Sequence, residues 1–246
     1  MKIPFWKGAG YLFVLSSCSS GYSDMKEFGF RDNPQTIITK IYDGPVIING
    51  QWAPRDENEY NSLMEMRVNP QGMVTEIISR NRSEEGVMEE NRTVYSFQDG
   101  RKSSGEIYDD NGSIVEYFTC HWVEDRICEI HGFDRNGVLK FTQKNFLDEE
   151  YRDVSGDYIL YSKKNGEIIF NEIYRNEYNA DGIMTVSESE HKTKSETGRF
   201  ISYRIKVRYE IISQDEKRNV TSALIYEDES EVPSRLLVRK IYYHHQ

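Results

Sequence analysis

The stretch Tyr108-Asp109-Asp110-Asn111-Gly112-Ser113-Ile114 places a short polar turn between two runs of strand-forming residues. The same order of residue types recurs at 68–74, 133–139 and 178–184: a large apolar residue, Asp or Asn, two further residues, Gly, and a return to apolar residues. An Asp or Asn side chain can hydrogen-bond the backbone two residues on, and glycine adopts the positive φ that closes a hairpin. We therefore predict a series of hairpins, with turns closed by Gly72, Gly112, Gly137 and Gly182.

Strand-forming runs follow one another closely from residue 63 onward. In Phe200–Ser213 apolar residues alternate with Ser, Arg, Lys and Glu, and Glu167–Tyr178 alternates likewise, with Glu172 the exception on its apolar face. No window of eleven or more residues has a convincing helical period. The expected strands are residues 36–42, 63–68, 73–80, 92–97, 103–108, 113–121, 127–133, 138–146, 157–162, 167–178, 183–190, 200–213, 219–227 and 235–243.

This pattern predicts an all-β fold, an antiparallel meander of consecutive long hairpins. Its apolar face must be covered, so the extended sheet is expected to be curled or partly closed, whether it folds over itself or closes into a barrel. With 246 residues the chain holds one large all-β domain or two small ones. The net charge of −10 repels phosphate backbones and no Lys/Arg cluster offsets it, so nucleic-acid binding is not expected.

The N-terminus has the organisation of a targeting peptide. Lys2 and Lys7 are followed by a short apolar run, Gly8–Leu15, which is far shorter than the roughly 20 residues that span a bilayer. The quartet Leu15-Ser16-Ser17-Cys18 resembles the lipobox of bacterial lipoproteins. The resemblance implies that residues 1–17 are cleaved, that Cys18 is lipidated and that the protein is held at the cell envelope. The alternative is an ordinary secretory peptide with an incidental cysteine.

The rest of the chain divides at about residue 36. Residues 18–35 are small, polar and weakly patterned, as a flexible tether would be, and residues 36–246 form the β-sheet domain. Ser19 follows the cysteine, and a residue of this kind permits passage to the outer membrane in some bacteria. We expect an outer-membrane lipoprotein whose membrane partner is reached through its lipid.

The two remaining cysteines, Cys120 and Cys128, flank a turn in an oxidising compartment. A turn at 123–125 places them opposite each other and allows a cross-strand disulfide, whereas a two-residue turn at 124–125 places Cys120 opposite Glu129. Two buried thiols are the alternative. His121 and His131 add the residue types of a zinc site, but strand alternation points these side chains to opposite faces, so no metal is predicted.

Three of the turns carry a family resemblance. Tyr-Asp-Asp-Asn-Gly at 108–112, Phe-Asp-Arg-Asn-Gly at 133–137 and Tyr-Asn-Ala-Asp-Gly at 178–182 resemble degenerate YD (RHS-like) repeats, which occur in bacterial lipoproteins of mostly unknown function. Residues 239–243 resemble the final strand of such proteins, and residues 40–44 their opening segment. The resemblance implies successive hairpins in an extended sheet and assigns no catalytic residue, because the Asp and Gly of the motif form turns.

No Gly-x-Ser-x-Gly, His-Glu-x-x-His, P-loop or dinucleotide motif is present, and we expect neither an enzyme nor a cofactor. The first functional hypothesis is a non-enzymatic β-sheet scaffold or binding module for a protein or glycan, whose ligand would stack on aromatic residues such as Trp52 and Trp122. The alternative is a carrier of a lipid or other apolar ligand in a barrel-like cavity. The two hypotheses differ in what the apolar side chains do: in a carrier they line a cavity for the ligand, and in a scaffold they fill the interior of the fold by packing on one another.

Overall fold

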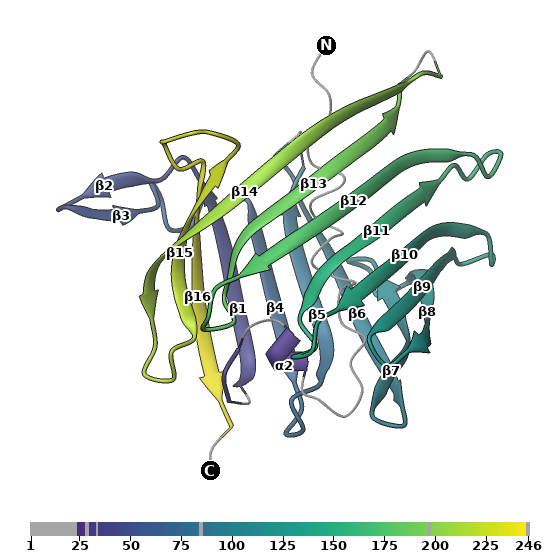
Figure 1. Cartoon of the computed structure of the whole chain (residues 1–246), viewed down its shortest axis with the longest axis horizontal. Coiled ribbons are helices and arrows are strands. Elements are labelled where there is room, and N and C mark those ends of the chain that lie inside the picture. The colour runs from purple at the N-terminus through teal and green to yellow at the C-terminus, as the bar shows by residue number, and fades with distance from the viewer. Residues whose placement is uncertain (1–23, 28–29, 33, 84–85, 196–197, 245–246) are drawn as a thin grey trace.

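The computed structural model describes residues 24–27, 30–32, 34–83, 86–195 and 198–244 (Figure 1). One helical turn, α2 (Asp24–Glu27), precedes the sheet. The strands are β1 (Pro34–Asp43), β2 (Val46–Ile48), β3 (Gln51–Ala53), β4 (Ser62–Val68), β5 (Val74–Arg82), β6 (Met88–Gln98), β7 (Arg101–Tyr108), β8 (Ile114–Glu124), β9 (Ile127–Asp134), β10 (Leu139–Leu147), β11 (Asp153–Tyr161), β12 (Ile168–Tyr178), β13 (Met184–Lys194), β14 (Phe200–Gln214), β15 (Val220–Glu227) and β16 (Arg235–Tyr243).

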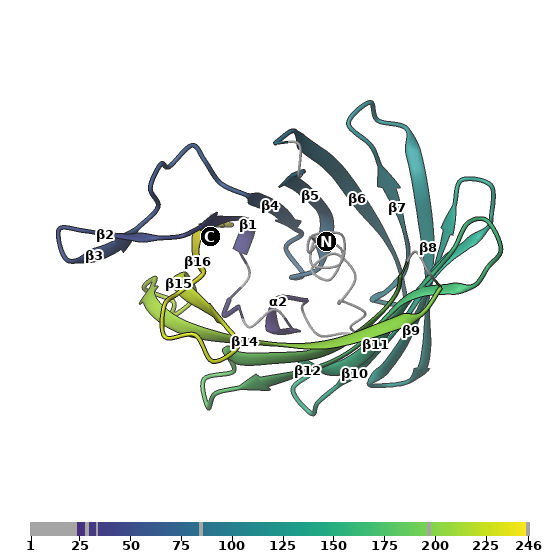
Figure 2. The ribbon, with the colours of Figure 1, turned by 90° about the horizontal axis from the view of Figure 1, so that it is seen from above.

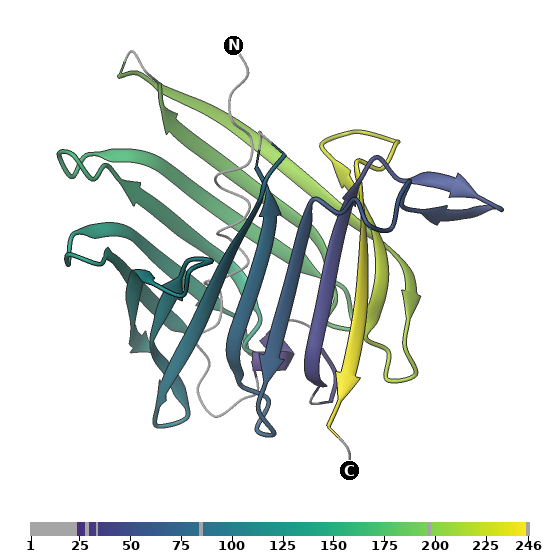
Figure 3. The same cartoon turned by 180° about the vertical axis from the view of Figure 1, so that it is seen from behind.

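Fourteen of these strands form a closed antiparallel barrel in which each strand from β4 to β16 pairs with its neighbours in sequence. Closure is made by β1, which pairs with β4 on one side and with β16 on the other. Seen from behind, β16, β1, β4 and β5 lie side by side (Figure 3). The short strands β2 and β3 form a separate hairpin that projects from the wall (Figure 2).

The predicted all-β meander is confirmed, and each of the expected strands corresponds to one strand of the barrel. Of the arrangements that the sequence left open, a curled, folded or partly closed sheet or a barrel, the structure has the closed barrel. The hairpin of β2 and β3 is not among the expected strands, because strands of three residues leave too short a pattern to detect. No helix among the described residues is long and apolar enough to cross a membrane.

The repeated turns share one hydrogen-bonded structure. In the turn 109–113 the Asp109 carboxylate accepts hydrogen bonds from the backbone of Asn111 and Ser113, and Gly112 has a φ of 75°. The turns that contain Gly72, Gly137 and Gly182 repeat these bonds, which confirms the predicted turns. The turns 148–152 and 215–219 have the same bonds but place Tyr151 and Arg218 at positive φ, so the glycine pattern did not reveal them.

Three inward glycines make room for aromatic rings on the adjacent strand. Gly105 pairs with Phe118, and Gly156 pairs with Tyr174. Gly132 pairs with Phe141, and a Cβ at Gly132 would lie 2.0 Å from that ring. The rings therefore lie flat over glycine backbone on the inside of the wall, an arrangement that offsets the weak strand propensity of glycine.

The described residues between 24 and 32 pack inside the barrel (Figure 2). Met25 and Phe30 belong to the same buried cluster as inward residues of the wall. Arg31 forms an ion pair with Asp181, and Asp32 forms one with Lys217. The expectation of a flexible tether over 18–35 is therefore wrong for these residues, since two buried apolar side chains hold them against the wall. Cys18 and the cleavage site lie outside the described residues.

The turn between β8 and β9 lies one position later than expected. Asp125 and Arg126 form it, and a register shift beside Glu124 places Trp122, not Cys120, opposite Cys128. Cys120 lies opposite Ile130 instead and carries a free thiol. The possible disulfide between Cys120 and Cys128 is therefore wrong, because it required a turn at 123–125, and the turn at 125–126 places Cys120 opposite a residue beyond Cys128.

Candidate functional site

The outer face of the barrel wall carries ion pairs between adjacent strands. Glu76 accepts from Arg67 at 2.5 Å and also pairs with Arg92, and Arg80 pairs with Glu90 at 2.5 Å. Inward residues alternate with these. A membrane-spanning barrel presents an apolar band outward, and a Lys or Arg at its lipid-facing midplane costs about 2–4 kcal/mol. The charged outer face has the chemistry of a surface in contact with water.

The inner face is mainly apolar over β1 and β4–β10; its one buried lysine among the described residues, Lys102, forms an ion pair with Asp24 at 3.1 Å. Its apolar side chains are buried and form one cluster with Met25 and Phe30, which shows that they point into the barrel. We call this set the apolar wall. It consists of Ile37, Met66, Ile77, Tyr95, Ile107, Phe118, Ile130 and Phe141.

The inner face changes character from β10 to β13, where buried polar side chains gather. We call this set the polar cluster: Gln143, Asn145, Asp153, Glu172, Tyr174, Ser189 and His191. The Tyr174 hydroxyl donates to Asp153 Oδ2 at 2.8 Å and lies 3.1 Å from Asn145 Oδ1, which also accepts from Gln143 Nε2 at 2.7 Å. Burial raises the pKa of Asp153 to about 8, so this acid is largely protonated at neutral pH.

Ser189, His191 and Glu172 have the residue types of a hydrolase triad, but their geometry differs from one. Ser189 Oγ lies 2.6 Å from His191 Nε2, and Glu172 Oε1 lies 3.4 Å from the same nitrogen. In a triad the nucleophile and the carboxylate contact opposite ring nitrogens. Burial raises the pKa of Glu172 to about 7 and lowers that of His191, so both neutral forms are favoured. The group is suited to hydrogen bonding rather than to relaying a proton.

Several atoms of the polar cluster have no hydrogen-bond partner. Among the described residues these include Asn145 Nδ2, Asp153 Oδ1 and Glu172 Oε2, all on side chains less than a tenth exposed. Buried polar atoms in folded proteins are nearly always satisfied by protein, water or a ligand. The polar cluster therefore has the capacity to donate and accept further hydrogen bonds inside the barrel.

A third group lies on β14–β16. Arg235 and Arg239 both point inward from β16, and Arg235 forms an ion pair with Glu227. Arg239 Nε donates to Thr39 Oγ1 at 3.3 Å, and its guanidinium lies 5.2 Å from the ring centre of Phe30. Burial lowers the pKa of Arg239 to about 10. No ion pair of Arg239 is found within the described part of the chain.

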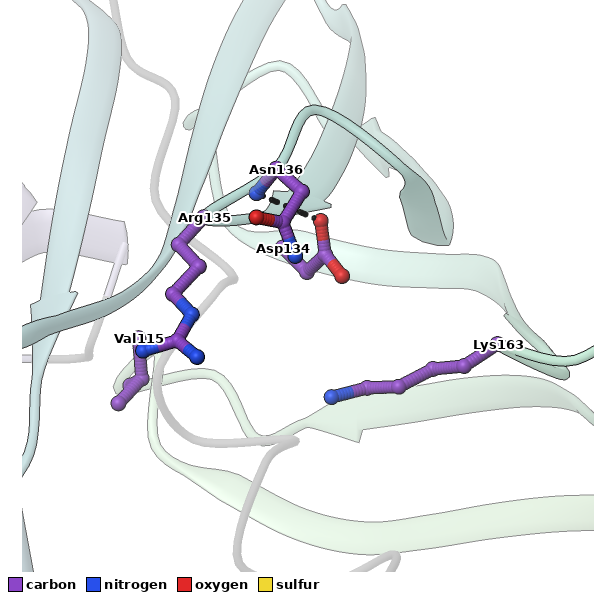
Figure 4. A pocket seen from close by; sticks show the side chains of 5 residues that line it. All are labelled: Val115, Asp134, Arg135, Asn136 and Lys163. Carbon is purple, nitrogen blue, oxygen red and sulfur yellow. Dashed lines mark hydrogen bonds between the residues drawn. The ribbon is translucent and has the colours of Figure 1, made fainter.

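A cleft of about 370 Å³ lies at the end of the barrel opposite α2 (Figure 4). It is lined by Val115, Asp134, Arg135, Asn136 and Lys163. The Asp134 carboxylate accepts from the backbone of Asn136 at 2.9 Å, and its bonds within the turn lower its pKa. Arg135 and Lys163 extend toward the cleft, which gives this rim a positive local charge.

The residues singled out from the sequence lie mostly away from the lumen. The four glycine turns are at the two rims, and Trp52 packs on the outer face against Tyr42 and Leu236. Trp122 points inward, where its Nε1 donates to the carbonyl of Lys102. Cys120, His121, Cys128 and His131 form no metal site in the described part of the chain.

The polar cluster and Arg239 were not singled out as a site, although Glu172 gave one signal as the exception in an otherwise apolar face. Asn145 and His191 gave none, because polar residues at alternate positions resemble a wet outer face. Arg239 gave no signal either, because the sequence does not reveal which side chains of β16 point into the barrel.

Comparison with known proteins gives no family. No family model matches the chain, and no curated protein matches it. Among solved structures, a protein of unknown function from Bacteroides fragilis NCTC 9343 is 11% identical, covers 47% of this chain and 89% of its own, and has a TM-score of 0.32. A porin-like protein from Bacteroides uniformis ATCC 8492 is 9% identical, covers 90% of this chain and 99% of its own, and has a TM-score of 0.35.

Proposed function

We propose that this protein is a non-enzymatic binding protein of the cell envelope that holds a lipid-like ligand inside its barrel. The observation that carries the proposal is the distribution of side chains on the closed wall. Charged pairs cover the outside, while the inside has an apolar wall facing toward a polar cluster with unsatisfied buried atoms. An amphiphile matches both kinds of lining.

The size of the barrel supports a ligand in its lumen. Strands about 4.8 Å apart and tilted near 40° give the 14-strand wall a perimeter of roughly 88 Å, or a diameter of roughly 28 Å if it is round. Facing sheets with interdigitated side chains stand only about 10 Å apart. A barrel of this width is therefore not filled by the side chains of its wall alone.

The scaffold for a protein or glycan is the weaker candidate. A scaffold would cover the apolar face of one sheet with another sheet, whereas here the apolar wall is turned into an enclosed space. The non-enzymatic part of the proposal is supported by the geometry of Ser189, His191 and Glu172, in which both partners lie at one ring nitrogen.

The lumen is tested with a neutral apolar dye, N-phenyl-1-naphthylamine, whose fluorescence rises in apolar surroundings. For this test, the chain from residue 19, which contains the whole described structure, is fused to a cleavable secretory signal peptide so that it is produced without the lipid anchor. Ile205 points inward from β14, and Ile173 is a half-exposed outward residue of β12. We expect Ile205→Lys to weaken dye binding about tenfold or more and Ile173→Lys to leave it unchanged. Equal effects of the two variants, or no binding by the parent protein, would refute a lumen site.

The lipid anchor on Cys18 is also part of the proposal and rests on the sequence Leu15-Ser16-Ser17-Cys18. It is tested by growing cells with radiolabelled palmitate and comparing the full chain with Cys18→Ala. We expect label and outer-membrane fractionation only with Cys18 present. An unlabelled mature protein that begins at another residue would contradict the anchor.

A further inference from the structure

Arg239 lies at mid-height on the inner face, among apolar side chains. It pairs with Thr39 of β1, and its inward neighbours along β16 are Leu237 and Ile241. Thr39 in turn pairs with Met64 of β4, which packs against the apolar wall. A charged group at this position is therefore next to the surface that would contact the tail of an amphiphile.

Among the described residues, no carboxylate compensates the charge of Arg239, in contrast to that of Arg235. Both arginines point inward from the same strand, but of the two only Arg235 has a carboxylate partner in this part of the chain, Glu227. Arg239 has a hydroxyl, Thr39, and the face of the Phe30 ring. An aromatic face attracts a guanidinium less strongly than a carboxylate does, and a cation away from water is costly unless it is paired.

The free edge of the Arg239 guanidinium has the shape of an anion receptor. Its Nε is occupied by Thr39, and neither Nη atom donates a hydrogen bond to any described residue. Two parallel N–H groups bind a carboxylate or a phosphate in a bidentate manner. Tyr209 lies within electrostatic reach of both inward arginines, so a hydroxyl donor is also close to this point.

From these observations we infer that the ligand of the lumen is an anionic amphiphile, whose carboxylate or phosphate head group pairs with Arg239 while its tail lies along the partly exposed apolar side chains at the edge of the apolar wall. The inference rests on the proposed function and specifies its ligand class. The head group would supply a counter-ion for Arg239, and the tail would cover the partly exposed side chains of Met64 and Ile241, which lie beside Arg239 at the edge of the apolar wall.

The test compares cis-parinaric acid with its methyl ester, which have the same fluorescent tail and differ in head-group charge. The chain from residue 19 is titrated with each, alongside Arg239→Met and Arg204→Met. Arg204 is an outward arginine whose side chain is 84% exposed, so the same substitution there is a matched control. We expect the acid to bind the parent about tenfold or more tightly than the ester. Arg239→Met should remove this preference, and Arg204→Met should retain it.

Equal binding of acid and ester by the parent would overturn the inference and leave the lumen proposal intact, whereas binding of neither would refute the lumen proposal itself. Retained preference in Arg239→Met would also overturn the inference. If that variant does not fold, as judged by circular dichroism, the acid–ester comparison on the parent decides. Dodecyl phosphate is the second anionic competitor: the anion that displaces the dye at lower concentration identifies the head group, and Arg239→Met must weaken both anions.

Discussion

The apolar wall and the polar cluster are built on the same strand geometry, yet they are held together by different interactions. Residues of the apolar wall are stabilised by contact with one another, with Met25 and with Phe30. The polar cluster is stabilised by a few hydrogen bonds around Tyr174 and contains buried atoms that lack partners. The difference indicates that the apolar wall stabilises the barrel, while the polar cluster can still form hydrogen bonds with a ligand.

The largest effect of a side-chain truncation is expected in the apolar wall. Phe118 is 1% exposed, lies over Gly105 and packs edge-on against Tyr95. Truncation to alanine removes these contacts and leaves a cavity, so Phe118→Ala should lower the free energy of unfolding by about 3–5 kcal/mol. Urea denaturation followed by tryptophan fluorescence measures the change. Outward Tyr117→Ala is the matched control, and an equal loss there would show that the two faces do not differ as described.

A second prediction concerns pH and the polar cluster. The folded pKa of Asp153 is raised from 3.8 to about 8 by burial, so the folded state favours the protonated acid. The stability this gives is fully present below pH 3.8 and is lost as pH rises through about 8. Relative to Asp153→Asn, the wild type should therefore lose on the order of 5 kcal/mol between pH 4 and pH 9.

Urea midpoints of the two proteins across this pH range provide the measurement. The Asp153→Asn variant keeps the shape of the side chain but cannot ionise, so it isolates the contribution of this one group. Parallel pH profiles for the two proteins would show that Asp153 does not titrate between pH 4 and pH 9 in the folded state. The apolar wall should show no such pH dependence, which sharpens the contrast between the halves.

The smallest effect is expected on the outer face. Arg80 and Glu90 form an ion pair at 2.5 Å, but each side chain is more than a third exposed. Exposed pairs are screened by water and salt, so a double-mutant cycle with Arg80→Ala and Glu90→Ala should give a coupling below about 1 kcal/mol, and less at 1 M salt. A coupling that equals the loss in Phe118→Ala would mean that this pair is not in contact with water.

The sequence was sufficient to predict the strands because their residues alternate, and to predict four turns because Asp or Asn and Gly recur at fixed spacing. The described residues 24–27 and 30–32 were misassigned because one apolar residue, Met25, and one aromatic residue, Phe30, give no periodic pattern. The predicted cysteine pairing failed because the turn lies at 125–126 and not at 123–125, a difference that no local pattern encodes. The polar cluster was missed for a different reason, since Asn145 and His191 occupy inward positions with residue types typical of an outer face.

The pairing of β1 with β16 has a consequence for how the molecule matures. Thr39 and Arg239 are 200 residues apart in the chain, and every other barrel pairing joins neighbours. Bringing together the ends of such a long segment carries a large entropic cost, so hairpins form early and the final seam forms late. Until β16 has joined the sheet, β1 and the growing end of the sheet are both exposed edges, which are prone to aggregate. A nascent chain therefore stays vulnerable until its last ten or so residues are delivered, and truncation there should harm yield more than truncation of the β2–β3 hairpin.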